Sequence, residues 1–162
     1  MFRSDELAAF TIDEFRRNLE GLSDEDALIR VPKDGGGEMN AISWVVQHIA
    51  SHWINVHAQG RDQPFRMDAL PPQDGTPPAY PDALALLEEG ARILEWLPDA
   101  PPEAFERRSM GNETVGQFLL RAVLHSWFHI GEINAVRQRL GHETVDFVGD
   151  FRGRLEWVPE QR

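Results

Sequence analysis

Two histidines, His125 and His129, stand four residues apart in the stretch LHSWFHIGE, inside the longest apolar-periodic segment of the chain. Residues four apart share one face of a helix, so the two imidazoles are expected to project side by side. Both fall on the apolar line that runs from Val115 through Ile133 to Val136 and should face the interior. Interior polar rings are costly to leave without partners. The pair therefore indicates either metal ligands or hydrogen-bonded core residues.

A third histidine, His48, lies near the middle of another predicted helix, over residues 41–59. The predicted helix of His125 and His129 is centred near Trp127, so the three rings lie at similar levels whether the two helices run parallel or antiparallel. Three imidazoles from two facing helices are typical of catalytic metal sites, which keep one position open for water or substrate. The pattern leaves two interpretations open, a metal triad or three histidines that merely pack.

A fourth histidine, His52, follows His48 by one helical turn. It is either a fourth ligand or an outer partner of the ligands, and as such a candidate proton acceptor, or a ring that packs beside Trp53. The remaining two histidines, His57 and His142, lie near predicted helix ends and are expected to face solvent.

Glu132 follows His129 by three residues and His125 by seven, so its carboxylate shares their helix face. A carboxylate in this position could orient an imidazole N–H or move a proton, which makes Glu132 the other candidate catalytic residue. The simpler expectation is an ordinary ion pair with Arg121 or Arg92.

Four amphipathic segments must position these residues. Apolar side chains at three- and four-residue spacings predict helices over about 5–21, 41–59, 82–97 and 114–140. Asn40 is placed to cap the second helix, and Gly141 follows the fourth, as glycine often does at a helix C-terminus. No segment shows a convincing two-residue alternation. The sequence therefore predicts an all-α four-helix bundle, with residues 1–162 as a single domain.

The connections differ in composition from the helices. The stretch LIRVPKDGGGEM, residues 28–39, is predicted to be a loop because of its consecutive glycines, and PDAPPEAFERRSMGN, residues 98–112, connects the last two helices. Residues 61–81 hold six prolines, which predicts a long ordered crossover loop that could overlie a site. The tail, residues 141–162, is too apolar to be free and is expected to pack along the bundle, partly as short extended pieces.

Charge and composition narrow the class of partner. With 16 basic and 27 acidic side chains the formal charge is −11, which opposes close approach to nucleic acid or anionic lipid. The chain has no cysteine, so a reactive thiol would have to come from another molecule. Acidic residues interrupt the N-terminus where a signal peptide would be apolar, and no apolar run approaches the ~20 residues of a membrane span. A cytoplasmic location is expected.

The stretches NAISWVVQHIASHW and VLHSWFHIGEINAVRQRLG resemble two motifs of the DinB-like (DinB/YfiT-like) superfamily. The first resembles the second-helix segment with its metal histidine, and the second resembles the H-x3-H-x-G-[EQ] helix. The resemblance covers most of the chain, to about Gly141. It implies an up-down-down-up bundle, usually a homodimer, that holds a zinc- or nickel-class ion. At the matching positions the ligands would be His48, His125 and His129.

Family members with known activity are similar to thiol-dependent enzymes, in which bacillithiol or mycothiol binds the metal as thiolate and is transferred to a substrate or used to isomerise it. The leading hypothesis is therefore a divalent-metal-binding, thiol-dependent transferase-like enzyme that acts on a small electrophile. One alternative is a metal–water hydrolase, with Glu132 or His52 as proton acceptor. Another is a non-catalytic dimeric metal-binding or stress-response module. The loop 61–81 and the tail match no family motif, and they are where substrate identity would be decided.

Overall fold

The computed structural model describes residues 3–145, and helices are the only regular secondary structure in this part of the chain. The all-α prediction is confirmed. Residues 146–162 of the predicted tail lie outside the described residues. In chain order the helices are α1 (Ser4–Arg17), α2 (Asp24–Leu28), α3 (Ile42–Gly60), the 3-10 helix η1 (Met67–Ala69), α4 (Tyr80–Ala91), α5 (Ile93–Trp96), the 3-10 helix η2 (Leu97–Asp99), α6 (Pro102–Glu106) and α7 (Val115–Arg139).

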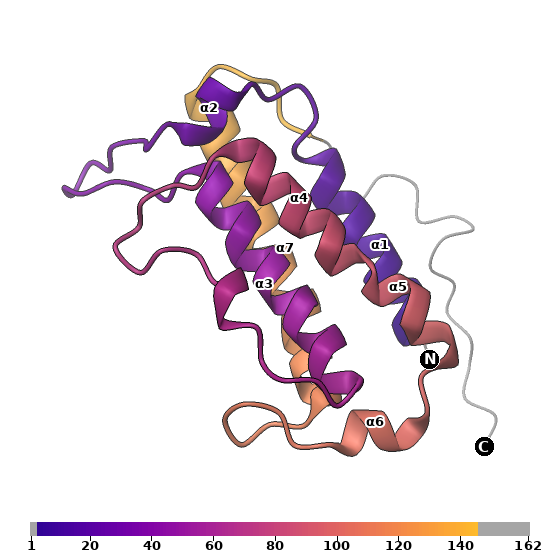
Figure 1. Ribbon diagram of the computed structural model, residues 1–162. Helices are drawn as coiled ribbons and strands as arrows, with labels where there is room; N and C mark the ends of the chain where they lie inside the picture. Colours follow the sequence, from indigo (N-terminus) through magenta and orange to yellow (C-terminus); the bar gives the residue numbers. More distant parts are fainter. Residues whose placement is uncertain (1–2, 146–162) are drawn as a thin grey trace.

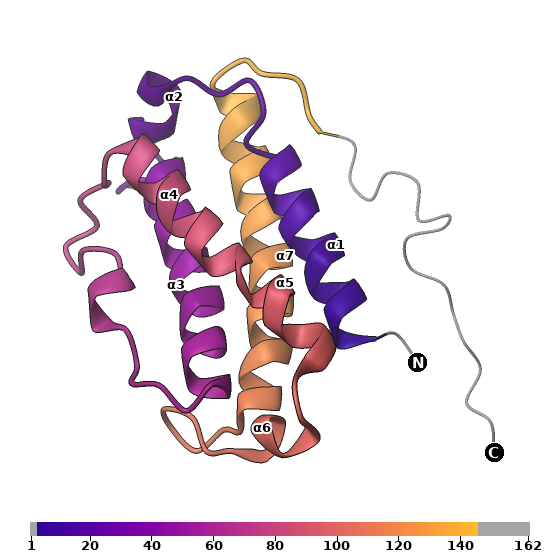
Figure 2. The same ribbon diagram turned by 45° about the vertical axis from the view of Figure 1, so that its right-hand side comes forward.

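Four helices, α1, α3, α4 and α7, lie side by side (Figures 1 and 2). In Figure 2, α1 and α7 run upward and α3 and α4 run downward. The helix α3 packs against α4 on one side and α7 on another, and α1 packs against α7. Because α7 and α3 run in opposite directions side by side, residues near their midpoints come to the same level.

The helix α3 is the most enclosed element, since 14 of its 19 residues are buried. Its apolar side joins side chains of α1 and α7 in one hydrophobic core. The largest fully buried side chains of this core include Phe15 of α1, Ile49 and Trp53 of α3, and Ile130 and Ile133 of α7. Burial of this much apolar surface is the main source of the fold's stability.

The proline-rich loop predicted over residues 61–81 lies along α3 and contains η1. Polar side chains of α3 hold its backbone. Asn55 accepts a hydrogen bond from the backbone N–H of Arg66 at 2.6 Å, and Gln47 donates to the carbonyl of Leu70 at 3.1 Å. Prolines have no backbone N–H and leave the loop with few backbone hydrogen bonds of its own, so these side-chain bonds hold it instead. They also explain why α3 buries polar residues on this side.

Several boundaries differ from the predicted ones. The predicted helix over 82–97 is two helices, α4 and α5, because the chain tightens at Arg92, whose N–H bonds the carbonyl of Glu89 three residues back. The helix α1 ends at Arg17 and not near residue 21. The short helices α2 and α6 lie in segments for which no helix was predicted, and α2 starts with a capping box between Ser23 and Asp26.

The cap predicted for the second helix is wrong. The N-cap residue of α3 is Ala41, which has no side-chain cap, and the side chain of Asn40 bonds Glu132 instead. Among the described helices none is long and apolar enough to cross a bilayer.

Candidate metal centre

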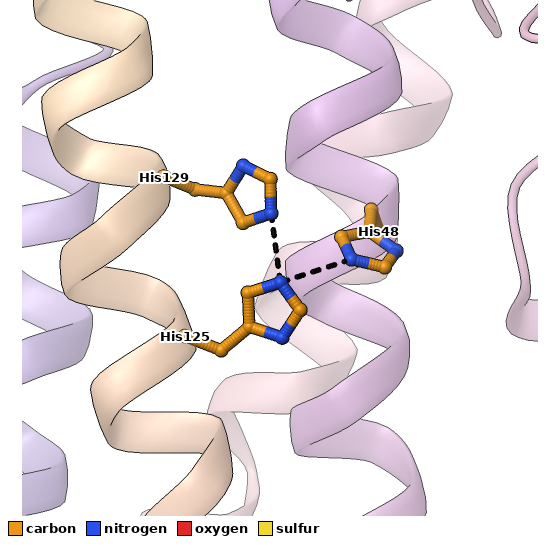
Figure 3. Close-up of side chains that lie close together, drawn as sticks. All are labelled: His48, His125 and His129. Carbon is orange, nitrogen blue, oxygen red and sulfur yellow. Dashed lines mark hydrogen bonds between the residues drawn. The ribbon is translucent and has the colours of Figure 1, made fainter.

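The three histidines of the predicted triad meet at the seam between α3 and α7 (Figure 3). Nε2 of His125 lies 2.9 Å from Nε2 of His129 and 3.4 Å from Nε2 of His48. One ligand atom from each ring lies within 4.8 Å of the others. Nitrogen ligands about 2.0–2.1 Å from a tetrahedral zinc ion stand roughly 3.3 Å apart. The spacing of the three rings therefore suits a shared ion, and their role as ligands stays a prediction.

Two interactions position α7: a capping box at its start and a hydrogen bond to α3. A capping box between Thr114 and Gln117 starts α7, so the register of every later residue on the helix is set there. Next to the triad, the indole Nε1 of Trp53 donates to the hydroxyl of Ser126 at 3.2 Å, which is a buried link between the two helices. The capping box thus fixes where α7 begins, and the bond between Trp53 and Ser126 joins α3 and α7 beside the histidines.

Glu132 orients His129. Its carboxylate lies 2.6 Å from Nδ1 of His129 and accepts a second hydrogen bond from the side chain of Asn40 at 3.3 Å. The hydrogen bond from His129, which is the largest cause, keeps the pKa of Glu132 below its ordinary value. Because an ionised carboxylate only accepts, Nδ1 of His129 carries the hydrogen and Nε2 is left with a lone pair facing the other two rings.

Neutral histidines cannot satisfy these contacts by themselves. Nε2 of His125 contacts Nε2 atoms on two sides but has at most one hydrogen to donate. At least one of the two contacts, to His129 or to His48, is therefore without a hydrogen bond. A divalent cation would accept the lone pairs of all three rings at once. The chemistry of this donor set fits a metal ion.

Two of the three rings, those of His48 and His125, are also held in the protonation state that metal binding needs. Burial, aided by the nearby His129 and His125, lowers the pKa of His48 to about 4. Burial likewise lowers the pKa of His125, followed by the effects of His129 and Arg121. Both imidazoles are thus neutral near pH 7, which is the form that binds metal.

His52 lies beside the triad but is not part of it. Its ring centroid is 4.8 Å from that of His48 and 4.7 Å from that of His125, yet its nitrogens fall outside the converging set. Its Nε2 lies 3.5 Å from Nη1 of Arg121, and burial lowers its pKa to about 3. Its Nδ1 is buried without a hydrogen-bond partner among the described residues. The geometry makes His52 a neighbour of the three candidate ligands.

The predicted ion pair of Glu132 with Arg121 or Arg92 is wrong. Arg121 instead bonds both carboxylate oxygens of Glu113, and its guanidinium lies over the ring of Phe118. Sequence reasoning missed Arg121 as a neighbour of the histidines, although its position four residues before His125 was a usable signal.

Two aromatic rings border the triad. Trp44 stacks on His48, with ring centroids 5.0 Å apart and planes 18° apart, and its Nε1 donates to the carbonyl of Pro72 at 3.0 Å. The loop between α3 and α4 thus touches the site through Trp44. The ring centroid of Phe128 lies 5.1 Å from that of His129 and 6.3 Å from that of His125.

The two histidines expected to face solvent are both partly buried. His57 lies 6.0 Å from the ring of Trp96, and burial lowers its pKa. Nε2 of His142 lies 3.3 Å from the carboxylate of Asp26. Neither ring approaches the triad.

A comparison with family models matches residues 8–133 to the model described as the DinB superfamily. The matched span contains His48, His125, His129, Glu132 and the whole connection between α3 and α4. No curated protein and no solved structure matches the chain.

Proposed function

Because this chain belongs to the DinB superfamily and brings three imidazole Nε2 atoms together, we propose that it binds a divalent metal ion through His48, His125 and His129. The observation that carries the proposal is the convergence of three imidazole Nε2 atoms that cannot all bond one another. Imidazole suits zinc, copper, iron and nickel, and the proposed metal is zinc or nickel, as the family resemblance implies.

We propose further that the protein is a thiol-dependent transferase-like enzyme, with a low-molecular-weight thiol of the bacillithiol or mycothiol type as cosubstrate and a small electrophile as substrate. A bound divalent ion is a Lewis acid that lowers the pKa of a thiol or water beside it. Three protein ligands leave a further position open for such a molecule. The chain has no cysteine, so the thiol must come from a second molecule.

The chain's own residues divide the remaining work. Glu132, held by Asn40, keeps His129 in one tautomer and one orientation. Arg121, whose charge is paired with Glu113, lies beside His52 and helps to lower the pKa of His125, which keeps that ring in the form that binds metal. Glu132 is already engaged by two donors, so an orienting role suits it better than proton transfer.

A metal–water hydrolase is the second candidate. The observation that favours it is the buried Nδ1 of His52, which has no partner among residues 3–145 and belongs to a ring beside His48 and His125. A non-catalytic dimeric metal-binding or stress-response module is the remaining alternative.

The finer architecture is also part of the proposal. The helix directions in Figure 2 support an up-down-down-up bundle. The exposed side chains of Leu120 and Leu124, one turn apart on α7, support a homodimer packed through helices. The charge of −11 supports small molecules over nucleic acid or membrane as partners, and the lack of cysteine agrees with a cytoplasmic location.

Metal analysis of protein purified without a metal-affinity tag tests the site. We expect about one equivalent of zinc or nickel in the wild type and in His57→Ala, a matched histidine variant on the same helix, and none in His125→Ala. Wild-type protein without metal, after incubation with zinc or nickel salts, would exclude the triad.

A screen of low-molecular-weight thiols with small electrophiles tests the reaction. We expect consumption of the thiol by the metal-loaded protein and not by His125→Ala. If metal is bound and no thiol is consumed, hydrolysis of ester substrates by wild type, reduced in His52→Ala, would favour the hydrolase instead.

A further inference from the structure

A pocket of about 610 Å³ opens at the C-terminal end of α3, in the size range of small-molecule sites. Its charged side chains and its one histidine come from three segments: His57 of α3, Arg61 and Arg66 of the following loop, and Glu89, Arg92 and Glu95 around the junction of α4 and α5. His57 stands nine residues after His48, which on an α-helix is about 13.5 Å along the axis and the opposite face. The pocket is therefore separate from the triad.

Two arginines of this pocket have no ionic partner. Within residues 3–145 the side chains of Arg61 and Arg92 form neither a hydrogen bond nor an ion pair, although the chain carries 27 acidic side chains. Arg66, by contrast, lies 2.7 Å from the carboxylate of Asp68 and 2.9 Å from that of Glu89. The charge of Glu89 is thus already offset, and the two other guanidinium groups are left for a ligand.

The two guanidinium groups act on the same part of the pocket. Burial lowers the pKa of His57, Arg61 and Arg92 lower it further, and Glu95 opposes them. Glu95 forms no ion pair with any described residue, so the unpaired side chains that line the pocket carry two positive charges and one negative charge. A net positive charge in an open pocket attracts an anion.

The end of α3 does not cancel this charge. A helix C-terminus is partly negative because its last carbonyl groups have no partner within the helix. Here the backbone N–H groups of residues 61–63 donate to the carbonyls of residues 57–59. The guanidinium of Arg107 donates to the carbonyl of Gly60 at 2.9 Å. These four carbonyls are thus satisfied, and Arg61 and Arg92 are not needed to cap the helix.

The turn after α3 fixes the backbone of Arg61. Asp62 has a φ of 59°, in the left-handed region that aspartate tolerates better than most residues. The side chain of Gln59 spans this turn and donates to the carbonyl of Gln63 at 2.7 Å. The position of Arg61 is therefore set before a ligand binds, which reduces the entropy lost on binding.

Close packing of α5 on the end of α3 brings Arg92 to the same pocket. A Cβ atom at Gly60 would overlap the ring of Trp96, so the absence of a side chain there lets the two helices meet. The Trp96 ring centroid lies 6.0 Å from that of His57 and 5.7 Å from that of Phe105. Arg92, which directly precedes α5, is thus held at the wall of the pocket.

We infer that this pocket binds the carboxylate or phosphate group of a small anionic molecule through Arg61 and Arg92, at a site separate from the metal centre. A guanidinium group pairs with either kind of oxyanion, because its N–H groups match two oxygen atoms at once. The inference goes beyond the proposed metal-dependent function and does not depend on it.

NMR titration of the full-length protein with succinate and with inorganic phosphate tests the pocket, with the ring signals of His57 as the local probe. The proteins are the wild type, Arg92→Gln, Glu95→Gln and Arg139→Gln. Arg139 is the matched control, because it is exposed, also lacks an ion pair in the described part of the chain, and lies outside this pocket at the end of α7.

We expect succinate, phosphate or both to shift the His57 signals and to saturate one site in the wild type and in Arg139→Gln. In Arg92→Gln the affinity should fall about 10-fold or more, as for the loss of one charge-assisted hydrogen bond. In Glu95→Gln it should rise, because the opposing charge is removed. Binding of only one of the two anions would assign the site to carboxylate or to phosphate groups. Because Arg92 is exposed, its replacement should leave the fold intact.

No saturable binding of either anion would overturn the site, and so would an equal loss of affinity in Arg92→Gln and Arg139→Gln, which would be an effect of net charge alone. His125→Ala separates the pocket from the metal centre. Unchanged binding in this variant supports the pocket, whereas loss of binding would place the anion at the triad and overturn the inference. Metal analysis tests the triad separately, so either proposal can fail while the other stands.

Discussion

The two faces of α3 differ in whether their buried polar atoms have hydrogen-bond partners. On the core face, Ile49 and Trp53 are almost completely buried, and the one polar atom of the Trp53 side chain bonds Ser126. On the face toward the seam, His52 has a buried nitrogen without a partner among the described residues, and His48 faces another imidazole nitrogen that cannot bond all its neighbours. The polar atom of Trp53 is thus satisfied in the free protein, whereas the contacts among the triad nitrogens cost free energy that a cation bound by them would return.

The largest expected effect is a loss of stability on the core face of α3. Trp53→Ala should lower the free energy of unfolding by about 3–5 kcal/mol, because it empties a large buried site and removes the bond to Ser126. Urea denaturation should show the same loss with EDTA and with zinc. Trp53→Phe, which keeps much of the volume, is the control and should lose less. A loss that appears only with zinc would mean that the two faces are not independent.

The seam should respond to metal and the core should not. Zinc at 100 times its dissociation constant should raise the free energy of unfolding of the wild type by about 2.7 kcal/mol, and that of His57→Ala equally. His125→Ala should show no rise, since the triad loses its central ring. Thermal or urea unfolding with and without zinc measures this. An equal rise in His125→Ala would place the ion elsewhere.

The support of the seam can be weakened without removing a ligand. Glu132→Gln keeps an acceptor for Nδ1 of His129 but removes the charge, so zinc affinity should fall about 10- to 100-fold. Calorimetric titration measures the affinity, and Glu88→Gln, at a surface ion pair with Arg16, is the control. Unchanged zinc affinity in Glu132→Gln would show that the carboxylate does not orient His129.

The smallest expected effect lies at the far end of α3. Burial lowers the pKa of His57 below its ordinary 6.5, Arg61 and Arg92 lower it further, and Glu95 opposes them. Below about pH 6.5 the unfolded chain binds a proton there more readily than the folded protein, so stability is lost as the pH falls. His57→Gln should therefore lose less stability than wild type between about pH 7 and pH 5.

Urea denaturation of metal-free protein at several pH values measures this difference. If both proteins lose the same stability over that range, His57 is not one of the groups that set the acid response.

Much of the site can be predicted from the spacing of residues along the chain. Helical periodicity predicts that His125 and His129 share a face, and the midpoints of two helices predict that His48 lies at their level. Both expectations depend only on helix geometry, which local sequence largely sets. The all-α fold class follows from the same periodicity.

Side-chain partners could not be predicted in this way. From the sequence, Glu132 could pair with Arg121, with Arg92 or with an imidazole. In the structure it bonds His129 and Asn40, and Arg121 bonds Glu113. Asn40 is suited to a helix cap by type, but its side chain is drawn to a carboxylate 92 residues away. The break between α4 and α5 likewise falls at Arg92, and this residue is neither a proline nor a glycine that would have marked it in the sequence.

By itself the sequence determined the helical periods, the family resemblance and the approximate level of the three histidines, because each depends on neighbours a few residues apart. Only the tertiary structure decided which ring nitrogens converge, which carboxylate orients His129, and that Trp44 and Phe128 border the triad. Such contacts join helices far apart in the chain, and they depend on how the helices rotate and slide as the shared core packs.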